Sequence, residues 1–166
     1  MNPRLLIILS VLVVWSPNSS YASSCAIISS ELAAKKAKVI FMGVADSVDV
    51  LNRSKYPEGE YYDSCGDKFV TFTPLKIWKG NIDSDTTVYS SDGCVGLGGY
   101  FEKGKEYLIY ASEAIKKGHY GKGSHQEIEA GQLYTTVCGR SSILGNDNSN
   151  KDLEYLNKNF KINDRN

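Results

Sequence analysis

The chain has 166 residues, with 19 basic and 19 acidic side chains, so its formal net charge at pH 7 is zero. This balance gives no electrostatic attraction to nucleic acid or to acidic membranes, and it excludes partners that are recognised mainly through charge. The length corresponds to one ordinary domain, and the sequence contains no internal repeat and no second hydrophobic span.

The first 22 residues predict a signal peptide. Arg4 precedes an apolar run from Leu5 to Trp15, which is too short to span a bilayer. Pro17 ends this run, and Ser20-Tyr21-Ala22 supplies the small residues that signal peptidase requires. We therefore expect an exported protein, secreted or periplasmic, whose mature chain is a single domain of residues 23–166 and a monomer.

A lipoprotein signal, with Cys25 lipidated, is the competing interpretation of this leader. Nine polar or small residues separate Trp15 from Cys25, whereas a lipobox normally follows the apolar run directly. Lipidation would also leave three thiols, an odd number for an oxidising compartment. The sequence therefore favours a cleaved signal without an anchor.

The mature chain predicts two helices and five strands. A serine cap and two lysines near the end predict a short helix over residues 29–37. Leu153, Leu156 and Phe160 share one face of a final amphipathic helix, predicted over 150–160. The predicted strands, rich in β-branched and aromatic residues, are Val39–Val50, Lys68–Trp78, Thr86–Tyr89, Glu106–Ala111 and Gln132–Cys138. Segments 52–67 and 119–129 are polar and predict loops.

Five short strands between two helices predict a small closed β-barrel, because closure removes the strand edges that would otherwise be exposed. Gly43 predicts a bulge or a close backbone approach in the first strand. Pro74 must lie at an edge or a bulge of the second strand. We expect the second and third strands to form a hairpin that turns near Asn81-Ile82.

Four cysteines remain in the mature chain, and in an exported protein this even number predicts two disulfides with three possible connectivities. The predicted hairpin brings the position opposite Cys65 close to Gly98, only four residues beyond Cys94. A Cys65–Cys94 bridge is therefore reachable, which leaves Cys25 and Cys138 as the second pair. A Cys25–Cys138 bridge closes a long loop, and the entropy that this removes from the unfolded chain stabilises a fold by roughly 4–5 kcal/mol.

Other side chains give weaker functional indications. His119, His125, Glu127 and Glu129 share one polar loop, but their spacing fits no standard zinc site, so we expect no metal in the free chain. The sequence contains no Gly-x-Ser-x-Gly, Walker or metalloprotease motif, and the thiols are better used as bridges. We therefore expect neither an enzyme nor a cofactor.

Two further features lie in the loop of residues 52–67. Asn52-Arg53-Ser54 is a glycosylation sequon, which has meaning only in a eukaryotic host. Tyr56, Tyr61 and Tyr62 cluster there and fit an aromatic contact surface as well as packing against the barrel.

Four stretches in order resemble the netrin module, specifically the N-terminal domain of tissue inhibitors of metalloproteinases and their bacterial relatives. In the first stretch, a cysteine soon after the signal precedes the predicted helix and the strand Ala37–Val44. The other three are Val70–Gly80 with its Ile-Trp-Lys-Gly ending, Gly99–Ala111, and Gly131–Arg140 with its Thr-Val-Cys-Gly-Arg ending. The resemblance covers nearly all of residues 23–160 and implies a mainly β fold, a five-stranded Greek-key barrel of the oligonucleotide/oligosaccharide-binding (OB) type.

Inhibitors of this family begin their mature chain with Cys-x-Cys, and the first residue chelates the zinc of the target protease through its α-amine and backbone carbonyl. The resemblance implies that Ser23, Ser24, Cys25 and Ala26 form the inhibitory ridge, with Ser23 as the zinc ligand. Chelation requires a neutral amine, whose ordinary pKa is near 8.

The chain departs from the family at one bridge. Ser23 occupies the position of the first family cysteine, and Gly98 occupies the place of its partner, so both ends of that bridge are missing together. Cys25–Cys138 matches the second family bridge, and Cys65–Cys94 is then an addition of this chain. A looser alignment makes Cys94 the displaced central cysteine, with Cys65 as its new partner.

Two functions follow from this sequence. The first is a secreted inhibitor that inserts Ser23–Ala26 into the cleft of a zinc metalloprotease. The second is a non-inhibitory recognition or adhesion domain that binds another protein, matrix or glycan through the barrel loops. The fold alone does not decide between them, because this barrel carries unrelated functions. The looser terminus left by the missing bridge costs roughly 1–2 kcal/mol for each backbone residue that binding must fix.

Overall fold

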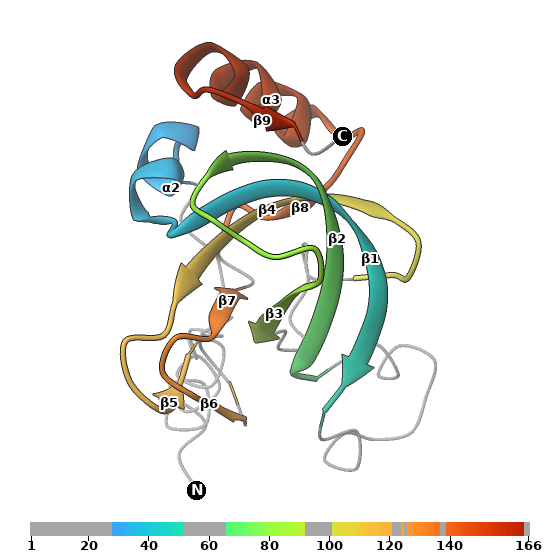
Figure 1. The fold of residues 1–166 in the computed structure, drawn as a ribbon, viewed down its shortest axis with the longest axis vertical. Coiled ribbons are helices and arrows are strands. Elements are labelled where there is room, and N and C mark those ends of the chain that lie inside the picture. Colours follow the sequence, from blue (N-terminus) through green and yellow to red (C-terminus); the bar gives the residue numbers. More distant parts are fainter. Residues whose placement is uncertain are drawn as a thin grey trace, which may run out of the picture.

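The computed structural model of the chain describes residues 28–51, 66–91, 101–120, 124, 126–136 and 139–164. These residues form two helices and nine strands (Figure 1). The helices are α2 (Ser30–Lys36) and α3 (Asp147–Asn159). The strands are β1 (Val39–Val50), β2 (Lys68–Lys79), β3 (Thr86–Ser91), β4 (Glu106–Glu113), β5 (Gly118–His119), β6 (Glu127–Ile128), β7 (Leu133–Thr136), β8 (Ser142–Ile143) and β9 (Asn163–Asp164).

Five of the strands close into a barrel. The strand order is β1-β2-β3-β7-β4, and β1 pairs with β4 as well as with β2, so no edge remains between them. β3 and β7 run parallel, whereas the other barrel pairs are antiparallel. The predicted mainly β fold, an OB-type five-stranded barrel with a short helix before it and a second helix after it, is confirmed.

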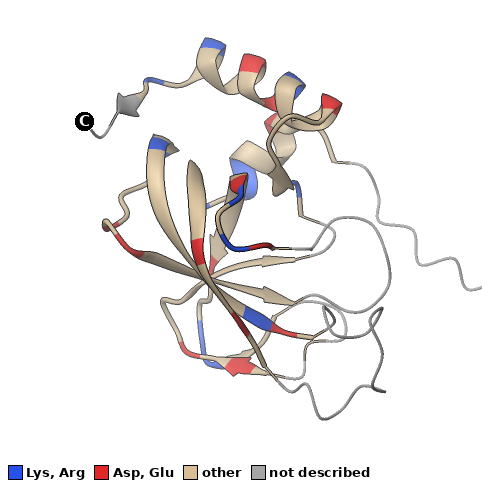
Figure 2. Ribbon diagram, turned by 90° about the vertical axis from the view of Figure 1, so that its right-hand side faces the viewer, with Lys and Arg blue, Asp and Glu red and all other residues tan. Residues whose placement is uncertain are grey.

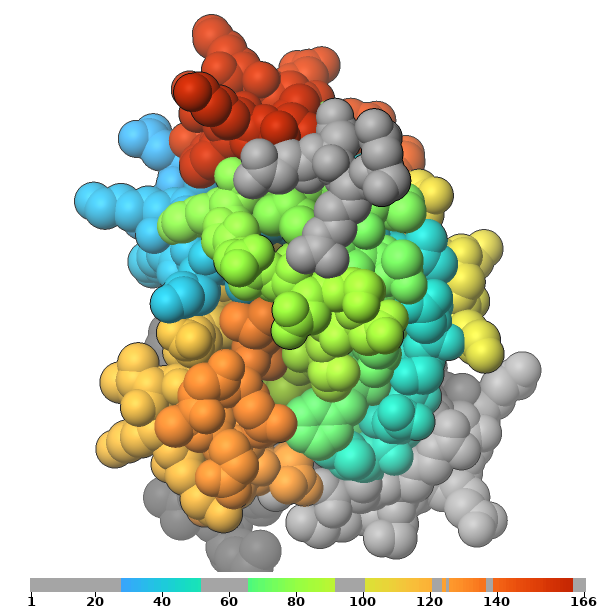
Figure 3. All heavy atoms as spheres, viewed as in Figure 1, coloured from blue at the N-terminus to red at the C-terminus, as the bar shows by residue number. Residues whose placement is uncertain are grey.

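The first half of β1 and most of β4 are buried on both faces, which explains the nearly continuous apolar sequence of these segments. Val39 and Phe41 on β1 point into the barrel with Ile109 of β4, whereas Ile40 and Leu108 point outward to the helices. The helices α2 and α3 cover this outer face at one end of the barrel (Figures 1 and 3). The outer cluster consists of Ala33, Ala34, Ala37, Ile40, Trp78, Leu108, Tyr110 and Leu156.

The two predicted irregularities of the first hairpin are present and lie opposite each other. Gly43 pairs with Pro74, and the register between β1 and β2 shifts between Met42 and Gly43. A Cβ atom on Gly43 would lie 2.8 Å from the backbone oxygen of Thr73, so the glycine permits a close approach of the two strands.

The register of the second hairpin differs from the prediction. A turn near Asn81-Ile82 would bring Lys68 opposite Val95, but Lys68 pairs with Ser90. The reason is that β2 pairs with β3 only as far as Phe72 and then continues along β1 to Lys79, so the connection to β3 is wide. As a result, the residue that pairs with Lys68 comes earlier in the chain than predicted.

Two other expectations about the elements need correction, and two short strands were not predicted. The predicted loop 119–129 contains part of a short ladder, in which β5 and β6 pair through Gly118–Ile128 and His119–Glu127. The final helix begins at Asp147 rather than near Asn150, because the side chain of Asn146 accepts a hydrogen bond from the Ser149 amide at 2.7 Å and caps the helix. The short strands β8 and β9 had no recognisable sequence pattern.

Candidate functional site

The predicted inhibitory ridge, Ser23–Ala26, lies outside the described residues, as do the four cysteines. The described chain begins at Ile28, two residues after Ala26. The part of the candidate site that can be built from geometry is therefore the structure that holds Ile28 and the start of α2.

A buried ion pair holds the chain at this point. The Arg140 guanidinium donates from Nε to both carboxylate oxygens of Asp152 at 2.7 Å, and from Nη1 to the backbone oxygen of Ile28 at 2.5 Å. The Ser30 hydroxyl donates to Oδ1 of Asp152 at 2.5 Å. We call these four residues, Ile28, Ser30, Arg140 and Asp152, the N-terminal anchor.

The anchor joins three segments that are far apart in the sequence. Ser30 is the first residue of α2, Arg140 lies between β7 and β8, and Asp152 lies in the middle of α3. The Asp152 side chain is 1 % exposed and that of Arg140 is 16 % exposed, so water screens their attraction only weakly. The helix that carries Asp152 is fixed to the barrel by Leu156, which is fully buried in the outer cluster.

The charge of Asp152 also reaches β4. Burial raises the pKa of the Tyr110 hydroxyl well above its usual range, and the negative charge of Asp152 adds to this shift, while Arg140 opposes it. Tyr110 therefore stays neutral beside the ion pair. The anchor is thus embedded in the packed layer between barrel and helices.

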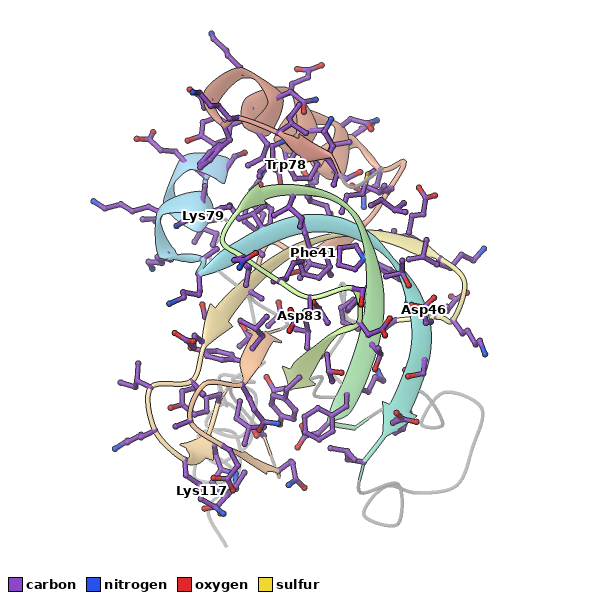
Figure 4. All side chains as sticks on the ribbon, in the orientation of Figure 1. Phe41, Asp46, Trp78, Lys79, Asp83 and Lys117 are labelled. Carbon is purple, nitrogen blue, oxygen red and sulfur yellow. The ribbon has the colours of Figure 1, made fainter. Side chains whose placement is uncertain are left out.

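A second charged group fixes the other end of α2. The Lys79 ammonium donates to the backbone oxygens of Ala34 at 2.7 Å and Ala37 at 2.5 Å, and more weakly to that of Lys35 at 3.4 Å. These carbonyls belong to the last turn of α2 and the residue after it, where the helix carries a partial negative charge. Figure 4 shows Lys79 beside α2. Together with the anchor, Lys79 holds both ends of a helix of only seven residues.

The Ile-Trp-Lys-Gly run of the sequence acquires a structural explanation from these contacts. Next to Lys79, Trp78 donates from Nε1 to the Oδ1 atom of Asn157 on α3 at 3.1 Å. Gly80 has φ +82°, and a Cβ atom there would lie 2.5 Å from a methyl carbon of Val39. The run therefore connects β2 to both helices and to β1.

The histidine loop does not form a metal site in the described part of the chain. His119 Nε2 lies 3.9 Å from Glu127 Oε1 across the β5–β6 ladder, and Lys117 pairs with Glu129 at 2.6 Å. His125 is outside the described residues. No group of three or more possible metal-binding side chains occurs among the residues that the structure describes.

Basic and acidic residues are interspersed along the described ribbon (Figure 2). Among the described residues, no helix is long and apolar enough to cross a membrane. Comparison with known protein families and with curated proteins finds no match to this chain.

Sequence reasoning missed the anchor. In the sequence, Arg140 is only the end of a family-like stretch, and Ser30 is only part of a helix start. Asp152 carries no local pattern, since nothing in the sequence distinguishes a buried aspartate on an amphipathic helix from an exposed one. The one weak indication was that Asp152 lies in the same helical turn as Leu153, which belongs to the apolar face of the helix.

Proposed function

We propose that this chain is an exported inhibitor of zinc metalloproteases, similar to the N-terminal domain of tissue inhibitors of metalloproteinases. The α-amine and carbonyl of Ser23 chelate the zinc of the target protease, and Ser23–Ala26 occupies its cleft. The supporting observation is that the chain is bound at Ile28 to a closed OB-type barrel, through a buried hydrogen-bonded ion pair. Only four residues separate Ile28 from the proposed zinc ligand.

The contact between Arg140 and Ile28 supports a Cys25–Cys138 disulfide. Cys25 precedes Ile28 by three residues and Cys138 precedes Arg140 by two. Such segments span at most about 10 Å and about 7 Å, so the two thiols are within reach of each other. This bridge would constrain the ridge covalently, directly beside the noncovalent anchor.

The observed register of β2 and β3 supports a Cys65–Cys94 disulfide more strongly than the predicted register did. Cys65 precedes Lys68 by three residues, and Cys94 follows its partner Ser90 by four. The parallel pairing of Ser91 with Thr136 also brings Cys138 within reach of Cys94, so the competing pairing must be tested. Mass spectrometry of unreduced peptides distinguishes the two, and a Cys94–Cys138 peptide would refute our assignment.

The decisive experiment measures inhibition of a panel of zinc proteases by the exported protein, after N-terminal sequencing has established that the chain begins at Ser23. A variant with one alanine added before Ser23 displaces the amine from the zinc, so we expect its inhibition constants to rise at least about tenfold. The matched control adds one alanine after Asn166 and retains full potency.

The pH dependence of inhibition gives an independent test. The amine must be neutral to bind zinc, so potency is expected to increase as the pH rises from about 6.5 to about 8.

Equal potency of the N-terminally extended variant would refute chelation. If no protease of the panel is inhibited, the alternative function, recognition of another protein, matrix or glycan through the barrel loops, replaces the proposal.

A further inference from the structure

We infer that Arg140 and Asp152 are positioning residues, which hold the N-terminal segment from Ile28 to the first turn of α2 in one conformation for binding. The functional half of this inference rests on the proposed function, whereas the structural half, that the anchor orders the start of the chain, does not.

The energetics of a buried ion pair favour a positioning role over a stabilising one. Removing two charges from water costs about as much as their attraction returns, so an apolar pair of similar volume is often as stable or more stable. The gain from the charged pair is geometric, because its hydrogen bonds fix direction as well as distance. Here Asp152 accepts from both Arg140 and Ser30, so the carboxylate fixes two segments at once.

The anchor acts on the backbone and not only on side chains. Arg140 Nη1 donates to the carbonyl oxygen of Ile28, which fixes the orientation of the peptide plane between Ile28 and Ser29 at the start of the described chain. Two residues later, Ser30 fixes the first turn of α2. The path of the chain is therefore constrained twice within three residues.

Arginine is specifically suited to this arrangement. Its planar guanidinium donates to Asp152 from Nε while Nη1 faces Ile28, so one rigid group sets the separation between α3 and the N-terminal segment. A lysine could neutralise Asp152, but it could not make both contacts with fixed geometry. Replacing Arg140 by lysine therefore keeps the positive charge and removes the planar shape, so the effects of charge and shape can be measured separately.

The test uses the double variant Arg140→Met with Asp152→Leu, which keeps a packed pair but removes the hydrogen bonds to Ile28 and Ser30. The milder variants Ser30→Ala and Arg140→Lys are measured alongside, in case the double variant does not fold. The matched control is Lys117→Gln with Glu129→Gln, which removes an ion pair that is exposed on both sides.

The first readout is hydrogen exchange of the Leu32 and Ala33 amides, which bond to the side chain and the carbonyl of Ser29 at the start of α2. We expect exchange at least about tenfold faster in the double variant, equivalent to about 1.4 kcal/mol, with Ile109 in the barrel unaffected. The control exchanges like the native chain. Unchanged exchange in the double variant, or in both milder variants if it does not fold, would overturn the inference.

The second readout is inhibition of the protease that the native chain inhibits best. We expect the double variant to be at least about tenfold weaker, and Arg140→Lys to be weaker although it keeps the charge. Faster exchange with unchanged potency would refute the positioning role. Faster exchange in a chain whose native form inhibits nothing would instead refute the proposed function and leave the ordering role of the anchor intact.

Discussion

The close contact at Gly80 gives a quantitative test of the connection between β2 and β1. Gly80 adopts φ +82°, and Gly104 adopts almost the same angle, φ +80°. A Cβ atom on Gly80 would lie 2.5 Å from a methyl carbon of Val39 and 2.8 Å from the backbone oxygen of Lys38, whereas one on Gly104 would meet nothing within 4 Å. Alanine at the two positions therefore shares the same backbone strain and differs in steric overlap.

The difference in stability can be estimated from these distances. Left-handed backbone costs an alanine roughly 1–2 kcal/mol, and this applies to both variants. Ordinary carbon contacts lie at about 3.5–4.0 Å, so Gly80→Ala creates an overlap of about 1 Å with Val39. Because Val39 and Lys38 belong to the packed start of β1, relieving the overlap costs a further 1–3 kcal/mol or so. The gain from a stiffer unfolded chain, about 0.4–1 kcal/mol, cancels in the comparison.

Urea unfolding of the two variants, with disulfides intact, measures this difference. With a slope of about 2 kcal/mol per molar, we expect the midpoint of Gly80→Ala to lie about 0.5–1.5 M below that of Gly104→Ala. Equal midpoints would show that Val39 can move away at no cost, and that the start of β1 is not held as tightly as its burial indicates.

Three more substitutions test the packing around the site. Lys79→Met leaves the last carbonyls of α2 without their cation, so we expect the free energy of unfolding to fall by about 1–3 kcal/mol. Amide exchange should become faster in α2 alone, and an equal increase throughout the chain would contradict this. Phe72→Ala removes a fully buried ring that makes edge contacts inside the barrel, so the free energy of unfolding should fall by about 3–5 kcal/mol. In the same thermal or urea unfolding experiment, Leu75→Ala, at a partly exposed position of the same strand, should cost less than about 1 kcal/mol. Burial raises the pKa of Tyr110, so the unfolded chain loses this proton first, and stability should fall as the pH rises above about 10. Tyr110→Phe should make the decrease of stability with pH smaller. If ultraviolet absorbance shows that every tyrosine of the native chain titrates near pH 10, the raised pKa of Tyr110 is contradicted.

The elements that could be predicted from the sequence are those specified by local patterns. The bounds of β1 agree with the prediction at both ends, because its apolar run is long and is followed by polar loop residues. The start of α2 was set by the Ser29 cap, and its end by the lysines. Gly43 and Pro74 were correctly expected at an irregularity because each residue restricts the backbone in its own way.

The features that could not be predicted depend on partners distant in the sequence. The register of β2 against β3 is set by where β2 leaves β3 for β1, and a turn signal at Asn81-Ile82 contains no information about that divergence. β9 exists only because the chain after α3 returns to Lys76 and Ile77. The anchor depends on a contact between residues 112 positions apart.

The length of α2 explains why such distant contacts matter at this end of the molecule. A helix of seven residues is too short to be stable on its own in water, so its position must come from tertiary contacts. Two buried alanines contribute little area, and the directional contacts are those of the anchor at its first turn and of Lys79 at its last. All of these partners come from segments that follow the first strand, so α2 can become ordered only after the barrel and α3 have formed. The order of α2 is therefore a property of the completed fold and not of the N-terminal sequence.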